Sequence, residues 1–131
     1  MTHKNLIVWQ KSIDLVEKIY NHTDSYPNEE LYGLTSQMRR ASVSIPSNIA
    51  EGHGRYSQKE LVRFLFISLG SASELETQII ISKRIRFINE DVYNELNNLV
   101  LEIIKMLSSL IKSKNNGTLI NPDDEPITNK N

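Results

Sequence analysis

Apolar residues recur along the chain at alternating spacings of three and four positions, which is the period of a helix with one buried face. Four segments show this spacing, and none shows the strict alternation typical of a half-buried strand. In chain order, the repeating positions are Leu6, Trp9, Ile13, Val16 and Tyr20, with Leu15 and Ile19 beside them; Leu34, Met38, Ala41, Ile45 and Ile49; Leu61, Leu65, Ser68, Ala72, Leu75 and Ile79; and Val92, Leu96, Leu99, Ile103, Met106 and Leu110. The pattern predicts four amphipathic helices that turn these positions toward a common core.

Proline and glycine divide the first half of the chain. The first helix is expected to end near residue 22, because Pro27 disfavours helical geometry in the residue before it. The second helix contains Pro46, and an interior proline removes a backbone hydrogen bond at a cost of roughly 3 kcal/mol. Since the apolar stripe keeps its phase across Pro46, we predict one helix kinked there rather than two short ones. Gly52 and Gly54 are expected to end it through left-handed backbone conformations.

Ser57 and Glu60 have the spacing of a capping box, in which each side chain accepts a hydrogen bond from the other residue's backbone N–H. The third helix is therefore expected to begin after Ser57 and to reach about residue 84, and the fourth to run from near residue 89 to 114. Short connections favour antiparallel neighbours with shallow crossing angles. The predicted fold is an all-α, antiparallel up-down-up-down four-helix bundle over residues 1–114, followed by a flexible C-terminal tail over residues 115–131.

The third and fourth helices have more apolar positions than one core-facing stripe accounts for. A helix that is apolar over much of its circumference must bury more than one side. Each helix of a monomeric four-helix bundle has a solvent face, so the surplus favours contact between subunits. A wide core stripe is the alternative interpretation. The predicted oligomer interface consists of Phe66, Leu69, Ile80, Ile81, Val100, Ile104, Leu107 and Ile111.

The net charge of the chain is −1, but its basic residues are concentrated in the middle. Residues 34–86 contain eight Lys and Arg against four Asp and Glu. A local basic patch attracts phosphate groups, which makes this segment a candidate anion-binding or nucleic-acid-binding surface. The alternative is a solvated face with intramolecular ion pairs. The candidate residues are Arg39, Arg40, Arg55, Lys59, Arg63, Lys83, Arg84 and Arg86.

The sequence lacks the residue patterns that catalysis or metal binding would need. It contains no cysteine, and His3, His22 and His53 do not have the spacing of helical zinc or di-iron sites. The glycine-rich phosphate loop of nucleotide-binding proteins is also absent. We therefore expect no enzymatic activity, catalytic residue, metal, cofactor or small-molecule substrate.

Two glutamates lie in an otherwise apolar part of the third helix. Glu74 and Glu76 are two positions apart, so they point to different sides of a helix and do not form an acid pair. A half-buried carboxylate needs a partner. We expect a structural ion pair between Glu74 and either Arg39 or Arg40.

The N-terminal apolar patch, residues 6–9, is too short for the apolar region of a signal peptide. No apolar stretch approaches the ~20 residues that span a bilayer. We expect a cytoplasmic protein that does not enter a membrane.

Four runs of residues are similar to a known family: Val8–Lys11, Glu30–Gln37, Arg39–Gly52 and Ser71–Gln78. They resemble the four-helix-bundle proteins encoded in intervening sequences of bacterial 23S ribosomal RNA genes, and the similarity covers roughly residues 5–114. The run Ile45-Pro-Ser-Asn-Ile-Ala-Glu-Gly52 is its most specific part. The resemblance implies an up-down bundle that assembles with copies of itself into a ring-like homopentamer.

The same resemblance extends to a branch that serves as an accessory factor of retroelement reverse transcriptases and binds nucleic acid and the polymerase. That branch is basic, whereas this chain is slightly acidic. The leading hypothesis is therefore a non-enzymatic, homo-oligomeric scaffold or adaptor, most simply a pentamer. The second hypothesis is an accessory factor that binds RNA or a nucleoprotein through the basic middle segment.

Overall fold

Residues 2–124 fold into four long helices and two short 3₁₀ helices. The structure is a computed structural model that describes residues 2–124. Within these residues there is no strand. In chain order the elements are a 3₁₀ helix at His3–Asn5, α1 at Ile7–Thr23, a 3₁₀ helix at Asn28–Glu30, α2 at Leu34–His53, α3 at Gln58–Arg84 and α4 at Glu90–Lys114.

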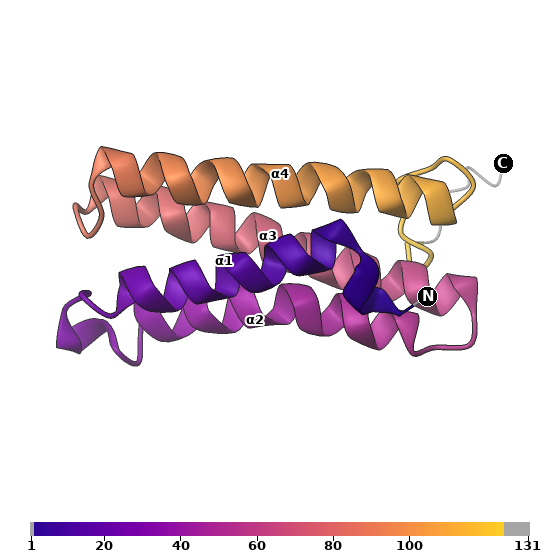
Figure 1. Cartoon of the computed structure of the whole chain (residues 1–131), viewed down its shortest axis with the longest axis horizontal. Coiled ribbons are helices and arrows are strands. Elements are labelled where there is room, and N and C mark those ends of the chain that lie inside the picture. The colour runs from indigo at the N-terminus through magenta and orange to yellow at the C-terminus, as the bar shows by residue number, and fades with distance from the viewer. Residues whose placement is uncertain (1, 125–131) are drawn as a thin grey trace, which may run out of the picture.

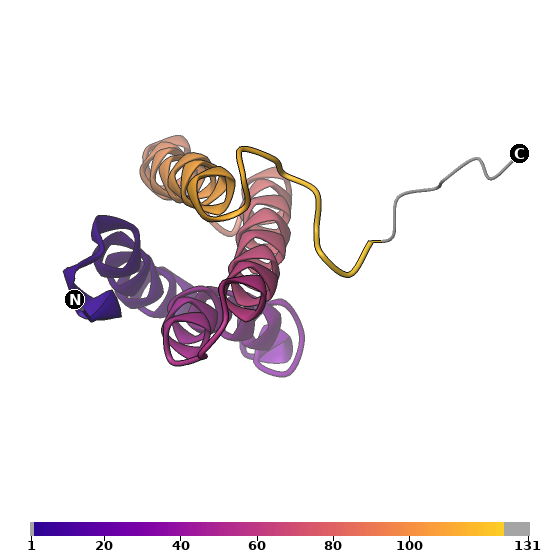
Figure 2. The same ribbon diagram turned by 90° about the vertical axis from the view of Figure 1, so that its right-hand side faces the viewer.

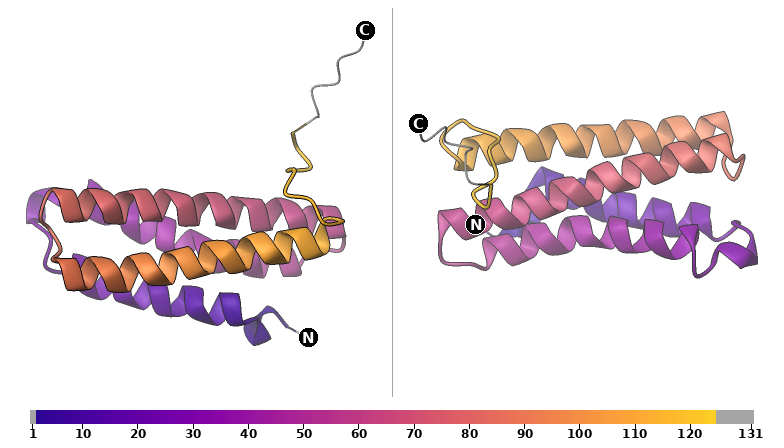
Figure 3. Two further views of the ribbon diagram at one scale, coloured as in Figure 1. Left: turned by 90° about the horizontal axis from the view of Figure 1, so that it is seen from above. Right: turned by 180° about the vertical axis from the view of Figure 1, so that it is seen from behind.

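The four helices lie side by side with alternating directions (Figure 1). The α1–α2 and α3–α4 connections are at one end of the bundle (Figure 3). We call it the acidic end, after Asp24 and Glu29 of the first connection and Glu90 and Asp91 of the first turn of α4. The α2–α3 turn, the N-terminal residues and the segment after α4 are at the other end, which we call the basic end. The predicted all-α, up-down-up-down four-helix bundle is confirmed.

Side-chain caps fix where the last two helices begin. The Ser57 hydroxyl accepts a hydrogen bond from the Glu60 backbone N–H at 3.1 Å, and the Asn89 side chain accepts one from the Val92 N–H at 2.9 Å. Only half of the predicted capping box is formed, because the Glu60 carboxylate binds the Arg63 side chain instead.

The core stripes of α2 and α3 match the predicted positions closely. Met38, Ala41, Ile45 and Ile49 are buried in α2, and the buried apolar residues of α3 include four of the predicted positions. Leu34 and Leu61 pack against the core from its edge. The buried α3 residues from the predicted stripe are Leu65, Ser68, Ala72, Leu75 and Ile79.

The core stripe of α1 differs from the predicted one by about one position. Val8, Leu15 and Ile19 are the buried apolar residues, whereas Ile13 and Tyr20 are exposed. Leu15 and Ile19, expected only beside the stripe, are its centre. The predicted α1 stripe is therefore wrong at Ile13 and Tyr20, although its first two positions, Leu6 and Trp9, pack against the core. α1 is apolar over so much of its circumference that its spacing fits two faces.

The core stripe of α4 is also displaced, and this corrects part of the predicted oligomer interface. Val100, Leu107 and Ile111 have no exposed surface within the chain itself. They form the core together with Leu96 and Ile103. These three residues do not need a partner subunit to cover them, so the wide core stripe is the correct interpretation for them.

α2 continues through Pro46 without interruption, which confirms one helix instead of two. Whether it is kinked at Pro46 stays a prediction. α2 ends at His53 with Gly54 as its C-cap, as predicted, but Gly54 has a φ of −82°, which is not left-handed, and the predicted end at Gly52 is wrong. Gly52 is instead a close-packing position against α3.

The segment after α4 turns back toward the start of α3 (Figure 2). Asn115 donates its side-chain N–H to the Ile120 carbonyl at 2.9 Å, and Asp123 binds Arg63 of α3. The predicted flexible tail thus includes a described part, residues 115–124, that contacts the bundle, while residues 125–131 lie outside the described residues.

α3 is long and apolar enough to cross a membrane if only length and composition are considered. No membrane-spanning segment was predicted from the sequence. A core helix satisfies the same criterion, and the buried face of α3 packs against α2 and α4.

Candidate functional site

One apolar surface lies between α1 and α2. Its central residues, Ile13 and Val43, are each 39% exposed, and Trp9 packs its ring edge-on against His3 at 5.2 Å between centroids. This surface exists because α1 directs Leu15 inward and still carries apolar residues on its outer side. We call it the α1–α2 face, and it is a hollow of about 280 Å³ lined by Trp9, Ile13, Val16, Val43, Pro46, Ser47 and Ala50.

A second apolar surface lies on α4. Leu101 is 42% exposed, and Ile104, a predicted interface residue, is only partly buried. Polar side chains surround these two residues, which is the arrangement of an apolar centre with a polar rim. We call this surface the α4 face, and it is a hollow of about 640 Å³ lined by Asn98, Leu101, Glu102, Ile104, Lys105 and Ser108.

The four predicted interface residues of α3 belong to neither face. Phe66 and Leu69 are partly buried against the core, Ile80 is also partly buried, and Ile81 is exposed. Ile67, which was not among the predicted interface residues, lies on the same helix with half of its surface exposed.

The eight candidate basic residues do not form one surface. α3 has 27 residues, which separates its two ends by about 40 Å at 1.5 Å per residue. Their positions in α2, in α3 and in the α3–α4 connection put three of the residues at the basic end and five toward the acidic end. Those toward the acidic end are Arg39, Arg40, Lys83, Arg84 and Arg86; those at the basic end are Arg55, Lys59 and Arg63.

Several of these cations are bound within the chain. Arg55 forms an ion pair with Glu51 at 2.6 Å, and Lys83 forms one with Glu90 at 2.9 Å. The guanidinium of Arg39 donates to the Thr23 hydroxyl at 3.0 Å and lies over an aromatic ring, that of Tyr20. For these residues the alternative interpretation, a surface with intramolecular contacts, describes the geometry better.

Lys59 and Lys114 line one hollow of about 390 Å³ at the basic end, where neither forms an ion pair with an acid of residues 2–124. Lys114 was missed by the sequence analysis, because it lies 55 positions after Lys59 and only the fold brings them together. The hollow is lined by Gln58, Lys59, Val62, Lys114, Asn115, Asn116 and Pro122.

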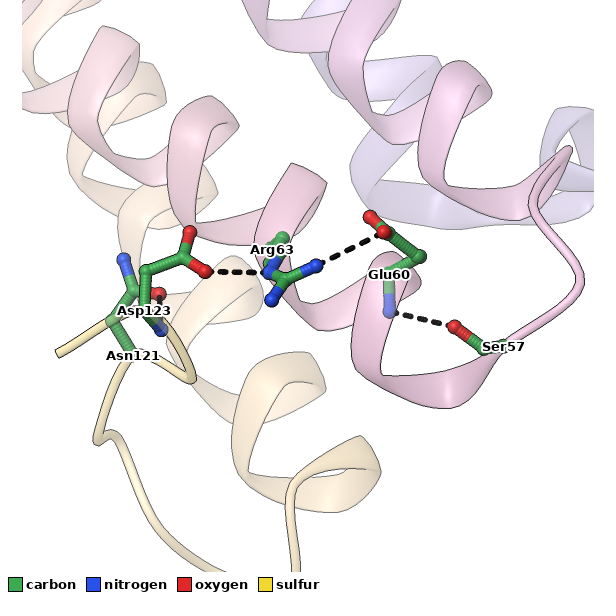
Figure 4. A network of polar contacts seen from close by, with 5 residues as sticks. All are labelled: Ser57, Glu60, Arg63, Asn121 and Asp123. Carbon is green, nitrogen blue, oxygen red and sulfur yellow. Dashed lines mark hydrogen bonds and ion pairs between the residues drawn. The ribbon is translucent and has the colours of Figure 1, made fainter. Parts of the chain in front are cut away.

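Arg63 is the best-connected cation of the basic end (Figure 4). Its Nε donates to Asp123 Oδ1 at 2.6 Å, and a terminal nitrogen donates to Glu60 Oε1 at 2.9 Å. The hydrogen bond to Asp123 raises the pKa of the Arg63 guanidinium, so the group stays charged. A predicted anion-binding residue thus already binds a carboxylate of its own chain.

The predicted ion pair of Glu74 is not formed. Glu74 is exposed, and its carboxylate accepts a hydrogen bond from the Gln78 side chain at 3.3 Å. Glu74 and Arg40 line the same polar hollow between α2 and α3, but they form no salt bridge, and Arg39 binds Thr23. The prediction is wrong because Glu74 lies on the outer side of α3, where water solvates a carboxylate without a partner.

Ion pairs connect α1 to α4 along their exposed sides. Lys11 binds Glu102 at 3.0 Å, and Lys18 binds Glu95 at 3.1 Å. The Glu95 carboxylate is also 3.5 Å from the His22 ring. The hydrogen bond from Lys18 lowers the pKa of Glu95 below its usual value, so this carboxylate stays ionised to lower pH than a free one.

Residues 2–124 contain no group of three or more His, Asp and Glu side chains arranged to hold a metal ion. The candidate functional surfaces of the described residues are the two apolar faces and the basic end.

Comparison with known proteins agrees with the fold. The family described as 23S rRNA-intervening sequence protein matches residues 4–109. The chain is also similar to a crystal structure of a protein with unknown function from the S23 ribosomal protein family of Bacteroides thetaiotaomicron VPI-5482, with a TM-score of 0.76 and 30% sequence identity, covering 86% of this chain and 99% of that chain. Among curated proteins none matches. The chain therefore belongs to the 23S rRNA-intervening sequence protein family.

Proposed function

We propose that this protein is a non-enzymatic, homo-oligomeric scaffold or adaptor that assembles into a pentameric ring in the cytoplasm, without a cofactor. The observation that supports this proposal is the pair of apolar surfaces described above. The α1–α2 face and the α4 face lie on different helices and share no residue.

Two different apolar surfaces on one subunit suit a ring. In a two-fold dimer each subunit uses the same patch, whereas in a cyclic ring one patch of each subunit binds the other patch of its neighbour. Trp9 and Ile13 on one face and Leu101 on the other supply the apolar centres for such a contact. Glu102 and Lys105 then lie at the polar rim.

The mass of the particle in solution tests this proposal. Sedimentation velocity and light scattering on the full chain at micromolar concentration are expected to give a particle of five copies of the 15.1 kDa chain. A stable particle of 15.1 kDa at these concentrations would contradict assembly. Another closed multiple would retain the scaffold and reject the pentamer.

A second candidate function is an accessory factor that binds RNA or a nucleoprotein. The observation that favours it is the basic end, where Lys59 and Lys114 line one hollow beside Arg63. This differs from the predicted use of the whole middle segment, because residues from the end of α4 replace those near the acidic end.

Salt dependence separates the two functions. Phosphate contacts release counterions, so RNA binding through this end is expected to weaken strongly between about 50 and 200 mM salt. Filter binding of structured RNA at both salt concentrations measures this. Absence of binding at the lower salt concentration would reject the second function and leave the scaffold proposal unaffected.

A further inference from the structure

The hollow at the basic end contains a concentration of positive charge. Lys59 comes from the first turn of α3 and Lys114 from the last residue of α4. Arg63 is one turn further along α3 than Lys59, and it binds Asp123, the residue after Pro122 of the hollow. Glu60 is bound to Arg63, so the two lysines face the hollow without an acid from the four helices.

The chain's own acidic segment reaches this hollow through Pro122, and the next residue, Asp123, lies beside Arg63 (Figure 4). Pro122 lines it, and the Asp123 carboxylate accepts a hydrogen bond from Arg63 Nε across 60 positions of sequence. Two local hydrogen bonds hold the segment in a turn: Asn121 Oδ1 accepts from the Asp123 N–H at 3.0 Å, and the Asn121 carbonyl accepts from the Asp124 N–H at 2.9 Å. The turn thus presents a carboxylate to an arginine.

We propose that the hollow between Lys59 and Lys114 is a phosphate-binding site, and that the segment Asn121–Asp124 is an intramolecular strap that competes with phosphate for it. The carboxylate of Asp123 takes the position at Arg63 that a phosphate oxygen would take, since carboxylate and phosphate oxygens both accept charge-assisted hydrogen bonds from a guanidinium. This inference rests on the second proposed function, in which the phosphate belongs to an RNA backbone.

The contacts that hold the strap on the bundle are few and exposed to solvent, so the strap can be released. The Asp123 side chain is 57% exposed, and an exposed ion pair contributes little to stability. No apolar side chain of Asn121–Asp124 other than Pro122 holds the segment on the bundle. A phosphate that binds Arg63 and both lysines makes more charge-assisted contacts than the one Asp123 carboxylate, so it can displace the strap.

Neutralising the strap tests the proposal on the full chain. The Asp123→Asn, Asp124→Asn variant is expected to bind a structured RNA roughly tenfold more tightly than the parent at about 100 mM salt, because the competing charge is removed. Fluorescence anisotropy measures this, and a titration with inorganic phosphate followed by the ¹⁵N resonance of Arg63 Nε gives a second readout. Adding Lys59→Ala and Lys114→Ala to the variant is expected to abolish the gain.

A variant with the same change in net charge at the acidic end is the matched control. Asp24 and Glu29 are exposed there and bind no cation in residues 2–124, so Asp24→Asn with Glu29→Gln is expected to leave both affinities within twofold of the parent. An equal gain in this control would show a general charge effect and overturn the strap.

The remaining outcomes separate the strap from the proposed function. RNA binding that is equal in the parent and the strap variant overturns the strap and supports the nucleic-acid function. Tighter binding of inorganic phosphate by the strap variant, without RNA binding by any variant, supports the strap and rejects RNA as the ligand. Failure of both ligands to bind overturns both.

Discussion

Gly52 of α2 lies so close to Phe64 of α3 that a β-carbon at position 52 would be 2.9 Å from the Phe64 β-carbon. It would also be 3.2 Å from the Leu61 carbonyl oxygen. Neither atom is the far end of a flexible side chain, so only a shift of one helix relaxes such a contact. The absent side chain at position 52 therefore sets how closely α2 and α3 pack near the basic end.

Replacing Gly52 with alanine is expected to destabilise the protein by about 1–3 kcal/mol, because overpacking outweighs the gain of up to ~1 kcal/mol in helix propensity. Urea unfolding followed by circular dichroism measures this. Gly70 is the matched control, since it lies in α3 with no atom within 4 Å of its would-be β-carbon. Gly70→Ala is expected to stabilise by about 0.5–1 kcal/mol. Equal effects at both positions would contradict the packing role of Gly52.

The positions of the helices followed from the sequence because local signals determine them. Ser57 and Asn89 cap α3 and α4 near the expected residues, and Pro27 lies in the predicted break after α1. These effects depend on neighbours within one helical turn. A single sequence contains them in full.

The sequence did not predict correctly which face of α1 and of α4 lies in the core. In α4, Leu99 and Val100 each belong to a stripe with a spacing close to that of a helix, and only packing against α1 and α3 buries Val100 more deeply. A stripe of apolar positions gives the period of a helix but not its rotation when more than one face is apolar. For this reason, three residues that were predicted to form a subunit interface, Val100, Leu107 and Ile111, belong to the core instead.

The basic end was only half predicted for a related reason. Lys59 and Arg63 were recognised as candidates, but Lys114 and Asp123 come from the opposite end of the chain. Their proximity depends on the antiparallel packing of α3 and α4, which places the start of one beside the end of the other. The charged residues that are close together in the sequence are therefore not the same set as those that are close together on the folded surface.

Replacing Glu74 with alanine is expected to change stability by less than about 0.5 kcal/mol, because the carboxylate is exposed and unpaired with arginine. The ion pair predicted from the sequence would instead make Glu74→Ala clearly more destabilising than Glu76→Ala. Thermal unfolding of both variants checks this. A clear loss of stability for Glu74→Ala, matched by an equal loss for Arg40→Ala, would contradict this expectation and support an ion pair between the two residues.

Glu95 is expected to contribute to stability in a pH-dependent manner. Its pKa is lowered in the folded state from the ordinary value of 4.5, so its contribution is present above pH 4.5 and is lost as the pH falls through the lowered value. Because the Glu95 side chain is 44% exposed, the effect is small, about 0.2–0.5 kcal/mol. Relative to Glu95→Gln, the parent should be more stable at pH 6, and the difference should shrink as the pH falls below 4.5.

Urea unfolding of the two proteins at a series of pH values measures the Glu95 effect. Glu17 is a suitable control, because it is exposed on α1 and forms no ion pair within residues 2–124. At pH 6, Glu17→Gln should change stability less than Glu95→Gln does. A stability difference for Glu95→Gln that persists unchanged to pH 3 would contradict the role of the Lys18 hydrogen bond.

A charge placed in either apolar face is expected to abolish assembly. Ile13→Asp disrupts the α1–α2 face and Leu101→Asp disrupts the α4 face, and both positions are exposed enough for the single chain to fold. Circular dichroism checks folding, and sedimentation velocity is expected to give 15.1 kDa for each variant alone. Ile67→Asp is the control, since Ile67 is exposed on α3 outside both faces and its replacement should leave the particle unchanged.

Mixing the two variants distinguishes a ring from a symmetric dimer. The Ile13→Asp chain keeps an intact α4 face, and the Leu101→Asp chain keeps an intact α1–α2 face. If the α4 face binds the α1–α2 face, one chain of each variant forms a dimer through the two unmodified faces. This dimer cannot add further chains, because its two remaining faces each carry the introduced aspartate. The expected result is a particle of two chains only in the mixture. If each face binds its own copy instead, mixing adds no contact that either variant lacks alone, and no new particle appears.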